Sequence, residues 1–294
     1  MFTEYLSNMI IKGGVAPVFD DPAQYGLAPE DVEFVSSDGV TLRGWLFRGS
    51  GTGIIVQSHF GVQCSRSGYT PEGKGWMPLW SQDIHFLKHI RALVDAGYSV
   101  LAYDTRNHGN SDTSNDNWVS WGPTERLDVL AAVRFVASHP DYKDSPIGLL
   151  SFCMGLASTT YAYGEEDGLG TISNIKALVG VQPLLYTDFM KSMKMPDFVN
   201  NWVNAKNSER TGVDLVNASF MPHVSKISVP TLLVQNKNDP FPDMANVDAY
   251  FEALTVEKER LDLDLEPQRA AAYAWVTESP DFLITFFDAH LRTA

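Results

Sequence analysis

The stretch that decides the fold is LLSFCMGLAS, residues 149–158. Its apolar run predicts a buried strand, and a helix-like run follows Cys153. Ser151 and Gly155, two residues before and two after Cys153, are both small. A sharp turn from strand to helix needs small residues at these places, because the two elements pass close to each other. The pattern therefore predicts a strand–turn–helix unit that presents the Cys153 side chain at its tip.

The rest of the chain repeats the alternation of strand and helix. Residues 31–37 and 40–49 alternate in polarity around a turn at Ser37-Asp38-Gly39, which predicts an antiparallel hairpin. Further strands are predicted at 53–61, 99–104, 146–151, 174–184, 229–239 and 259–266, and helices at 78–98, 123–139, 244–255 and 280–291. Strands that alternate with helices predict a mostly parallel sheet with helices on both faces. Ligands of such sheets bind at the carboxyl ends of the strands.

The composition is that of a globular protein. The chain has 294 residues, of which 44% are hydrophobic, and carries a net charge of -14. An acidic surface argues against nucleic acid or an anionic membrane as partner, and no apolar stretch is long enough to span a bilayer. Two cysteines make no disulfide framework or zinc motif. The N-terminus is a poor signal peptide because Glu4 interrupts it, so we expect a soluble, cytoplasmic protein.

Two segments depart from the regular rhythm. Residues 1–30 have weak periodicity and are interpreted as an N-terminal arm, which is compatible with a homodimer; residues 31–294 form the main domain. Residues 184–229 are rich in Met and aromatic side chains and are interpreted as a cap over the strand ends. The alternative is a long connection packed on the sheet.

From about residue 32 to residue 291 the chain resembles the α/β-hydrolase superfamily. The turn at Cys153 is similar to the nucleophile elbow of that superfamily, with Cys in place of the usual Ser. The segment from Asp104 to Ser111, DTRNHGNS, resembles the superfamily's DxRGxGxS segment, which shapes a loop. The Cys in the elbow and the SHFGV segment, residues 58–62, resemble the dienelactone-hydrolase-like branch. The resemblance implies an α/β-hydrolase fold with a short cap.

The resemblance implies Cys153 as the nucleophile, and the helix N-terminus beneath it would favour the thiolate. The alternatives are a buried inert thiol, or Ser151 as nucleophile, which lies two residues too early. The oxyanion hole would use the backbone N–H of Met154 and one N–H from the loop of residues 59–61, where we favour Gly61 over Phe60. Cys64 lies in the same loop as His59 and Gly61, and it could approach Cys153 as a redox partner.

The superfamily's chain order is nucleophile, acid, histidine. Asp239 follows the strand at 229–239 at the position of the acid, with Asp243 as the second choice. The histidine should follow the last strand, near residues 266–272, but no histidine is present there. The candidate bases are therefore His59, which also fits a loop-structuring role, His223 and Glu266; a fourth, His290, lies near the chain end.

Other histidines suggest less. His85 and His89 lie four apart on a predicted helix, a spacing that can bind metal, but no third ligand is evident. We expect no metal and no organic cofactor. The sequence thus predicts a hydrolase or acyl-transfer enzyme that acts on a small ester, lactone or thioester through Cys153. Two alternatives stay open: a hydrolase-fold enzyme that catalyses a cyclase, lyase or isomerase step, and a ligand-binding protein without catalysis.

Overall fold

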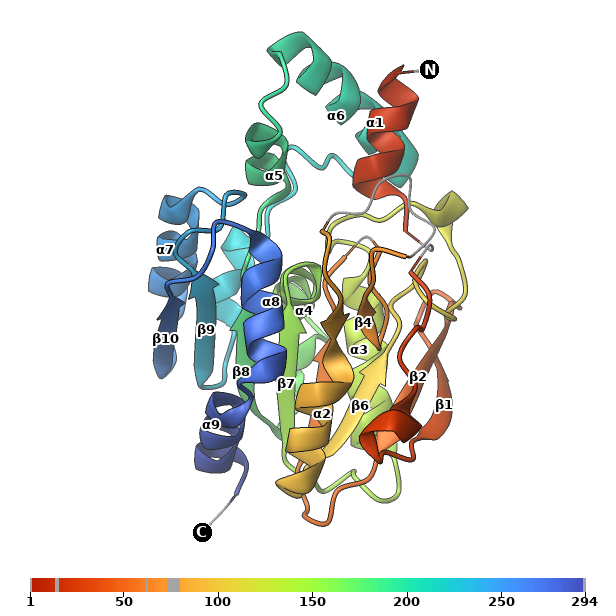
Figure 1. Ribbon diagram of the computed structural model, residues 1–294, viewed down its shortest axis with the longest axis vertical. Helices are drawn as coiled ribbons and strands as arrows, with labels where there is room; N and C mark the ends of the chain where they lie inside the picture. The colour runs from red at the N-terminus through yellow and green to blue at the C-terminus, as the bar shows by residue number, and fades with distance from the viewer. Residues whose placement is uncertain (1, 14–15, 62, 73–79, 293–294) are drawn as a thin grey trace.

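The computed structural model describes residues 2–13, 16–61, 63–72 and 80–292 (Figure 1). An eight-stranded sheet forms its centre, in the order β1-β2-β6-β3-β7-β8-β9-β10. The strands of the sheet are β1 Glu30–Val35, β2 Thr41–Phe47, β3 Ile54–Ser58, β6 Ser99–Tyr103, β7 Ile147–Phe152, β8 Ile175–Val181, β9 Thr231–Asn236 and β10 Lys258–Leu263. The short strands β4 Gly68–Tyr69 and β5 Ile84–His85 pair separately.

The sheet is mostly parallel. Strand β2 pairs antiparallel with both β1 and β6, and the other pairings are parallel. The hairpin predicted around Asp38 is confirmed, since Val35 pairs with Thr41. Because β3, β6, β7, β8 and β9 run the same way, the loops that follow them meet at one edge. This edge is at the top of Figure 1.

Helices cover both faces of the sheet, as the sequence predicts. They are α2 Phe86–Asp95, α3 Arg126–Ser138, α4 Met154–Gly164, α7 Met244–Ala253, α8 Arg269–Glu278 and α9 Asp281–Leu291. Helices α3, α4 and α7 share one hydrophobic core with the sheet, and α2, α8 and α9 share the other. In Figure 1, α2, α8 and α9 lie in front of the sheet. Residues on both faces are apolar, which is why β3, β6 and β7 are buried along their whole length.

One predicted helix starts later than expected, and one observed helix has no counterpart among the predictions. The helix predicted over 78–98 begins only at Phe86, because Ile84 and His85 pair with the strand β4; residues 78–79 lie outside the described residues. Helix α8 was not predicted at all, although it starts at Arg269 directly after the last strand. Its first residues contain a run of alanines, whose spacing gives no clear apolar periodicity.

A third hydrophobic cluster lies above the carboxyl edge of the sheet. Helices α5 Tyr186–Ser192 and α6 Asp197–Thr211, from the segment interpreted as a cap, pack there with α1 Phe2–Ile11 (Figure 1). The buried members of the cluster are Leu6, Ile10, Ile11, Tyr186, Met190, Val203 and Leu215. The first residues of the chain therefore belong to the roof over the strand ends.

Helix α1 is held in this place by polar contacts as well. The indole Nε1 of Trp121 donates to the carbonyl of Ile10 over 3.1 Å, and the N–H of Val119 donates to the carbonyl of Ile11 over 2.7 Å. Arg210 of α6 donates to the side chains of Ser7 and Asn8, each over 2.9 Å. The bonds from Trp121 and Val119 satisfy carbonyls at the end of α1 that have no partner within the helix.

Candidate active site

The elbow at Cys153 has the strained backbone that its sequence pattern predicts. Cys153 lies between β7 and α4 with φ 46° and ψ −104°, in a region that side chains with a Cβ rarely adopt. A Cβ on Gly155 would lie 2.4 Å from the carbonyl oxygen of Ser58, so only glycine fits. The Ser151 hydroxyl is buried and hydrogen-bonded to Thr159 Oγ1 at 2.8 Å. The elbow thus presents Cys153, and Ser151 points into the packing beneath it.

Cys153 lies in a pocket between the sheet edge and the roof. Most of the pocket wall is apolar and aromatic. Its lining residues are Met9, Ile10, Phe60, Gly61, Trp80, Trp121, Cys153, Met154, Leu184, Phe189, Phe241, Arg269 and Tyr273. Such a wall suits an apolar ligand, and Cys153 and Arg269 are the polar or ionisable groups that stand out in it, together with the Tyr273 hydroxyl.

The two residues expected to form the oxyanion hole lie together. Met154 is the first residue of α4, so its backbone N–H is one of those that have no partner within the helix. Gly61 lines the same pocket, and a Cβ there would lie 2.6 Å from Met154 Sδ. The structure therefore brings Gly61, Met154 and Cys153 to one place.

Arg269 occupies the region where the superfamily pattern calls for a histidine. It is the first residue of α8, and 2% of it is exposed. Its Nη1 donates to Asp239 Oδ2 and its Nη2 to the backbone carbonyl of Gln182. Its Nε donates to the Tyr273 hydroxyl over 2.8 Å. Three of its five N–H donors are thus fixed, and the guanidinium is held rigidly.

Gln182 completes this clamp from the other side. The Gln182 side-chain Nε2 donates to the backbone carbonyl of Arg269 over 2.8 Å, and the Gln182 backbone carbonyl accepts from Arg269 Nη2. Gln182 follows β8 and has φ 53°, so the backbone turns sharply at the point where its carbonyl meets the guanidinium. Two polar residues from different strand ends therefore fix each other in both directions.

Cys153, Arg269 and Tyr273 form one electrostatic group. Burial lowers the pKa of Arg269, but the charge of Cys153, with Tyr273, Asp239 and a hydrogen bond to Cys153, raises that pKa above its ordinary value. Burial raises the pKa of Tyr273 well above its ordinary value; Arg269 opposes this shift, and Cys153 adds to it. At neutral pH the guanidinium is therefore charged and the phenol is protonated. Both groups line the pocket with Cys153, and because both keep their protons, neither can take a proton from the thiol.

Asp239 lies where the sequence places the acid. It is buried, its Oδ1 accepts from the N–H of Phe241 over 3.1 Å, and its Oδ2 accepts from Arg269. Asp243, the second choice, instead caps α7, where Oδ1 accepts from the N–H of Ala245 over 3.1 Å. Of the two carboxylates, the structure brings Asp239 to the pocket's polar group and leaves Asp243 at a helix start.

His59 is not among the pocket residues. Its Nδ1 lies 2.6 Å from the carbonyl of Phe60, and its Nε2 accepts from the N–H of Thr105 over 3.1 Å. Burial lowers the pKa of His59 to about 4. Both ring nitrogens thus bind the backbone of two loops, which is the loop-structuring role considered for this residue.

The remaining candidate bases lie elsewhere. His223 is in the 3₁₀ helix η4 Met221–Lys226, beside Tyr161 and Gly164 at the far end of α4. Glu266 is exposed, and its carboxylate accepts from Gln268 Nε2 over 2.9 Å. His290 lies in the last turn of α9 beside Phe286. The structure does not bring these three side chains into the pocket with Cys153.

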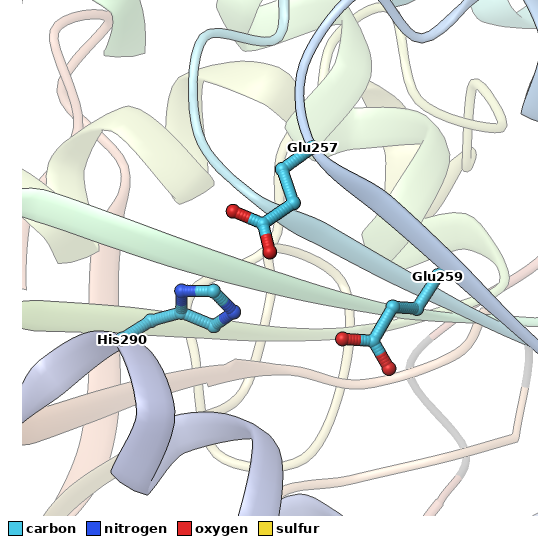
Figure 2. Close-up of side chains that lie close together, drawn as sticks. All are labelled: Glu257, Glu259 and His290. Atoms are coloured by element: carbon cyan, nitrogen blue, oxygen red, sulfur yellow. The ribbon is translucent and has the colours of Figure 1, made fainter.

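His290 belongs to a different group, drawn in Figure 2. Its ring faces the carboxylates of Glu257 and Glu259, and one ligand atom from each residue lies within 4.8 Å of the others. Both glutamates are exposed. The spacing predicted for His85 and His89 gives no common site, because His85 bonds Asp20 over 2.8 Å whereas His89 is buried against Gln57.

The two cysteines are free thiols. Cys64 is fully buried, and burial first, then the charge of Asp104, raises its pKa well above the ordinary value.

The Asp104–Ser111 segment shapes this region. Asp104 accepts from the backbone and guanidinium of Arg66, and a Cβ on Gly109 would lie 2.2 Å from the Asp104 carboxylate. The tight turn at Gly109 therefore keeps the loop closed on Asp104.

Arg269, Tyr273 and the α1 residues Met9 and Ile10 are among the pocket residues that the sequence alone does not predict. Arg269 falls inside the 266–272 window, where the superfamily pattern expects the site histidine, so its position in the sequence is the signal for a site residue. No local signal could place α1, because it reaches the pocket through contacts with residues about 110 and 200 positions away.

The fold matches solved α/β-hydrolase structures. An esterase from Pyrococcus furiosus superposes with a TM-score of 0.68 at 21% identity, covering 97% of this chain and 99% of that one. The α/β hydrolase GrgF from Penicillium sp. sh18 superposes with a TM-score of 0.61 at 19% identity, covering 90% and 99%. The chain has the α/β-hydrolase fold. At these identities the likeness concerns the fold alone.

No family model matches the chain. Among curated proteins, a polyketide transferase of Aspergillus fumigatus is 28% identical over 166 residues, which are 56% of this chain and 49% of that protein. The polyketide transferase grgF of a Penicillium species is 24% identical over 246 residues, 78% of this chain and 72% of that protein. The thiohydrolase aneE of Aspergillus aculeatus is 23% identical over 204 residues, 68% and 56%.

The chain spans about half the length of the first of these relatives. All three are enzymes by name, which agrees with the prediction of a hydrolase or acyl-transfer enzyme. Among the residues that the structure describes, no helix is both long and apolar enough to cross a bilayer.

Proposed function

We propose that the protein transfers an apolar acyl group from a thioester onto Cys153. The observation that carries this proposal is the place of Arg269: a permanent cation, anchored on Asp239, lies beside a cysteine in a strained elbow. A cation beside a thiol favours the thiolate, which is the attacking form. The names of the curated relatives, polyketide transferases and a thiohydrolase, agree with acyl and thioester chemistry.

The attack on the carbonyl needs donors for the developing oxyanion. The N–H of Met154 and an N–H of the loop at Gly61 are the proposed donors, since both residues line the pocket beside Cys153. The Arg269 cation lines the same pocket as Cys153, and a thiol beside a cation can attack as the thiolate without a base. The apolar wall holds the acyl chain.

A thioester suits this site better than an oxygen ester. When Cys153 displaces a thiolate, the leaving group departs as a stable anion and needs no proton. An alkoxide leaving group needs a general acid, and a histidine normally supplies that proton. Among the described pocket residues none is a histidine. The finer resemblance to the dienelactone-hydrolase-like branch stays a prediction.

Intact-protein mass spectrometry tests the proposal. The protein is exposed briefly to acyl-N-acetylcysteamine thioesters of increasing chain length. We expect one acyl mass on the wild type and on Cys64→Ala, and none on Cys153→Ala. An adduct that persists in Cys153→Ala, or the absence of any adduct with a folded wild-type protein, would contradict the assignment of Cys153 as nucleophile.

A further inference from the structure

We infer that the acyl group leaves Cys153 for a second thiol, so that the site exchanges acyl groups between sulfur atoms. The inference rests on the proposed function and extends it to the acceptor. Its basis is that the ionisable groups beside Cys153 among the described pocket residues, Arg269 and Tyr273, both keep their protons, whereas a transfer to water or to an alcohol needs a group that accepts a proton.

The donor character follows from the contacts. Arg269 cannot lose its proton in a protein. Tyr273 receives a hydrogen bond from Arg269 and is left to donate its own proton. Asp239 is the nearest carboxylate of the group, but Arg269 Nη1 and the N–H of Phe241 occupy its two oxygens. Among the residues that the structure describes around the pocket, the carboxylate that could act as a base is therefore neutralised by Arg269, the residue in the window where a histidine is expected.

Geometry also keeps Asp239 from acting through Arg269. In a nucleophile–histidine–acid arrangement the middle ring passes a proton because one nitrogen accepts while the other donates. A guanidinium has donors on every nitrogen and no acceptor. Arg269 thus connects Asp239 to Cys153 electrostatically and blocks proton transfer between them.

Both halves of a thiol exchange balance without a base. In the first half, the Cys153 thiolate attacks R–CO–S–R′; the new C–S bond forms, the old one breaks, and R′–S⁻ departs. In the second half, an acceptor R″–S⁻ attacks the acyl–Cys153 thioester; R–CO–S–R″ forms and the Cys153 thiolate returns. No proton is taken up or released by the protein in either half.

The acceptor must bring its own nucleophile, and this selects its class. A free thiol is a few per cent thiolate near neutral pH and is intrinsically nucleophilic. Alcohols and water are almost fully protonated there, and amines of the lysine type, with a pKa of about 10.4, are nearly all cationic. A reaction that forms an acyl thioester must supply the donor, and one that consumes an acyl thioester must follow.

The partition of the acyl-enzyme tests the inference. The wild-type acyl adduct is freed of donor by desalting and is then offered buffer alone, or buffer with an equal millimolar amount of N-acetylcysteamine, ethanol or methylamine. The same adduct unfolded in urea is the matched control for uncatalysed exchange. Loss of the acyl mass and the identity of the product are followed by mass spectrometry.

We expect the thiol to remove the acyl group at least about tenfold faster from the folded than from the unfolded protein, and the buffer to remove it no faster from one than from the other, because a general base that contributes about 10²–10⁴-fold is missing. Faster loss to water from the folded adduct, or catalysed transfer to ethanol or methylamine but not to the thiol, would overturn the inference. Absence of the adduct would instead overturn the proposed function.

Arg269→His gives an independent test. A histidine there would lie between Asp239 and Cys153 and supply the missing base, so water should remove the acyl group at least about tenfold faster than in the wild type. Arg48→His is the control, since Arg48 is exposed and pairs with Glu30 and Asp141 on the surface. A folded Arg269→His protein with unchanged hydrolysis would contradict the inference; if it does not fold, the wild-type partition decides.

Discussion

Arg269 and Asp239 form a buried ion pair in which Nη1 donates to Oδ2, and the side chains are 2% and 0% exposed. The pair joins the start of α8 to the loop after β9, two segments that meet at the carboxyl edge of the sheet. Its electrostatic effect reaches Cys153, whose charge is among the causes that raise the pKa of Arg269. The pair therefore links the framework of the edge to the reactivity of the pocket.

Removal of Asp239 should destabilise the fold strongly. Asp239→Ala leaves the Arg269 cation buried without its partner, which costs about 3–5 kcal/mol. Asp243→Ala is the matched control; it removes only a helix cap, worth about 1 kcal/mol. Urea unfolding of both variants measures the difference. Equal losses in the two variants would show that the ion pair contributes no more than a surface cap.

Removal of the Arg269 charge should make Cys153 less reactive. Arg269→Gln keeps hydrogen-bonding capacity but removes the cation that favours the thiolate. We expect carboxamidomethylation of Cys153 by iodoacetamide to slow by at least about tenfold. Peptide mass spectrometry separates Cys153 from the fully buried Cys64, which serves as the internal control in the same molecule. An unchanged rate of carboxamidomethylation in a folded variant would show that Arg269 does not control the reactivity of Cys153.

Enlargement of Ile10 should shorten the acyl groups that the pocket accepts. Ile10 is buried in α1 and lines the same pocket as Cys153, so Ile10→Trp fills part of that pocket. Long-chain acyl thioesters should acylate the variant at least about tenfold more slowly, whereas short ones keep their rate, because one misfitting methylene is worth about 1–3 kcal/mol. Phe2→Trp is the control, because Phe2 is on the same helix and 64% exposed. A uniform change across chain lengths would argue against a wall formed by α1.

Acid should weaken the fold through buried histidines. His89 is enclosed by Phe86 and Phe152, and burial lowers its pKa to about 3. An unfolded histidine has a pKa of about 6.5, so between these values the unfolded chain binds a proton that the folded chain does not. The contribution of His89 to stability is therefore complete above about pH 6.5 and is lost progressively as the pH falls.

The His89→Gln variant isolates this contribution. Its unfolding free energy should fall less steeply than that of the wild type between about pH 6.5 and pH 4, by up to about 1.4 kcal/mol per pH unit. Urea unfolding at several pH values measures the slope of unfolding free energy against pH for both proteins. A general loss of stability in the variant shifts its whole curve and leaves the difference between the two slopes unchanged. Parallel curves would contradict a neutral buried His89.

The sequence was sufficient to predict the sheet and the elbow because both depend on local patterns. Apolar runs such as 147–152 mark strands that are buried on both faces, and the small residues around Cys153 are dictated by a steric limit that the 2.4 Å contact of Gly155 makes explicit. The position of Asp239 followed from its distance to the end of β9. These features need no knowledge of distant contacts.

The role of Arg269 could not be predicted in the same way. The superfamily pattern gives the right window but calls for a histidine there, and the sequence holds an arginine. Its meaning depends on three partners that come from other strand ends and from the next turn of α8: Asp239, Gln182 and Tyr273. The position of α1 could not be predicted from local sequence either, because the hydrogen bond from Trp121 to Ile10 joins residues 111 positions apart.

The fixed cation at position 269 has a consequence for how this protein would be found in a cell extract. Fluorophosphonate reagents, which survey hydrolases of this fold, label a serine that a histidine has activated, whereas the tip of this elbow carries Cys153 and no histidine is among the described pocket residues. Thiol-directed electrophiles with anionic leaving groups match a cysteine beside a guanidinium instead. A chemoproteomic survey built on serine reactivity would leave this hydrolase-fold protein unlabelled, and one built on cysteine reactivity would report it among thiol enzymes.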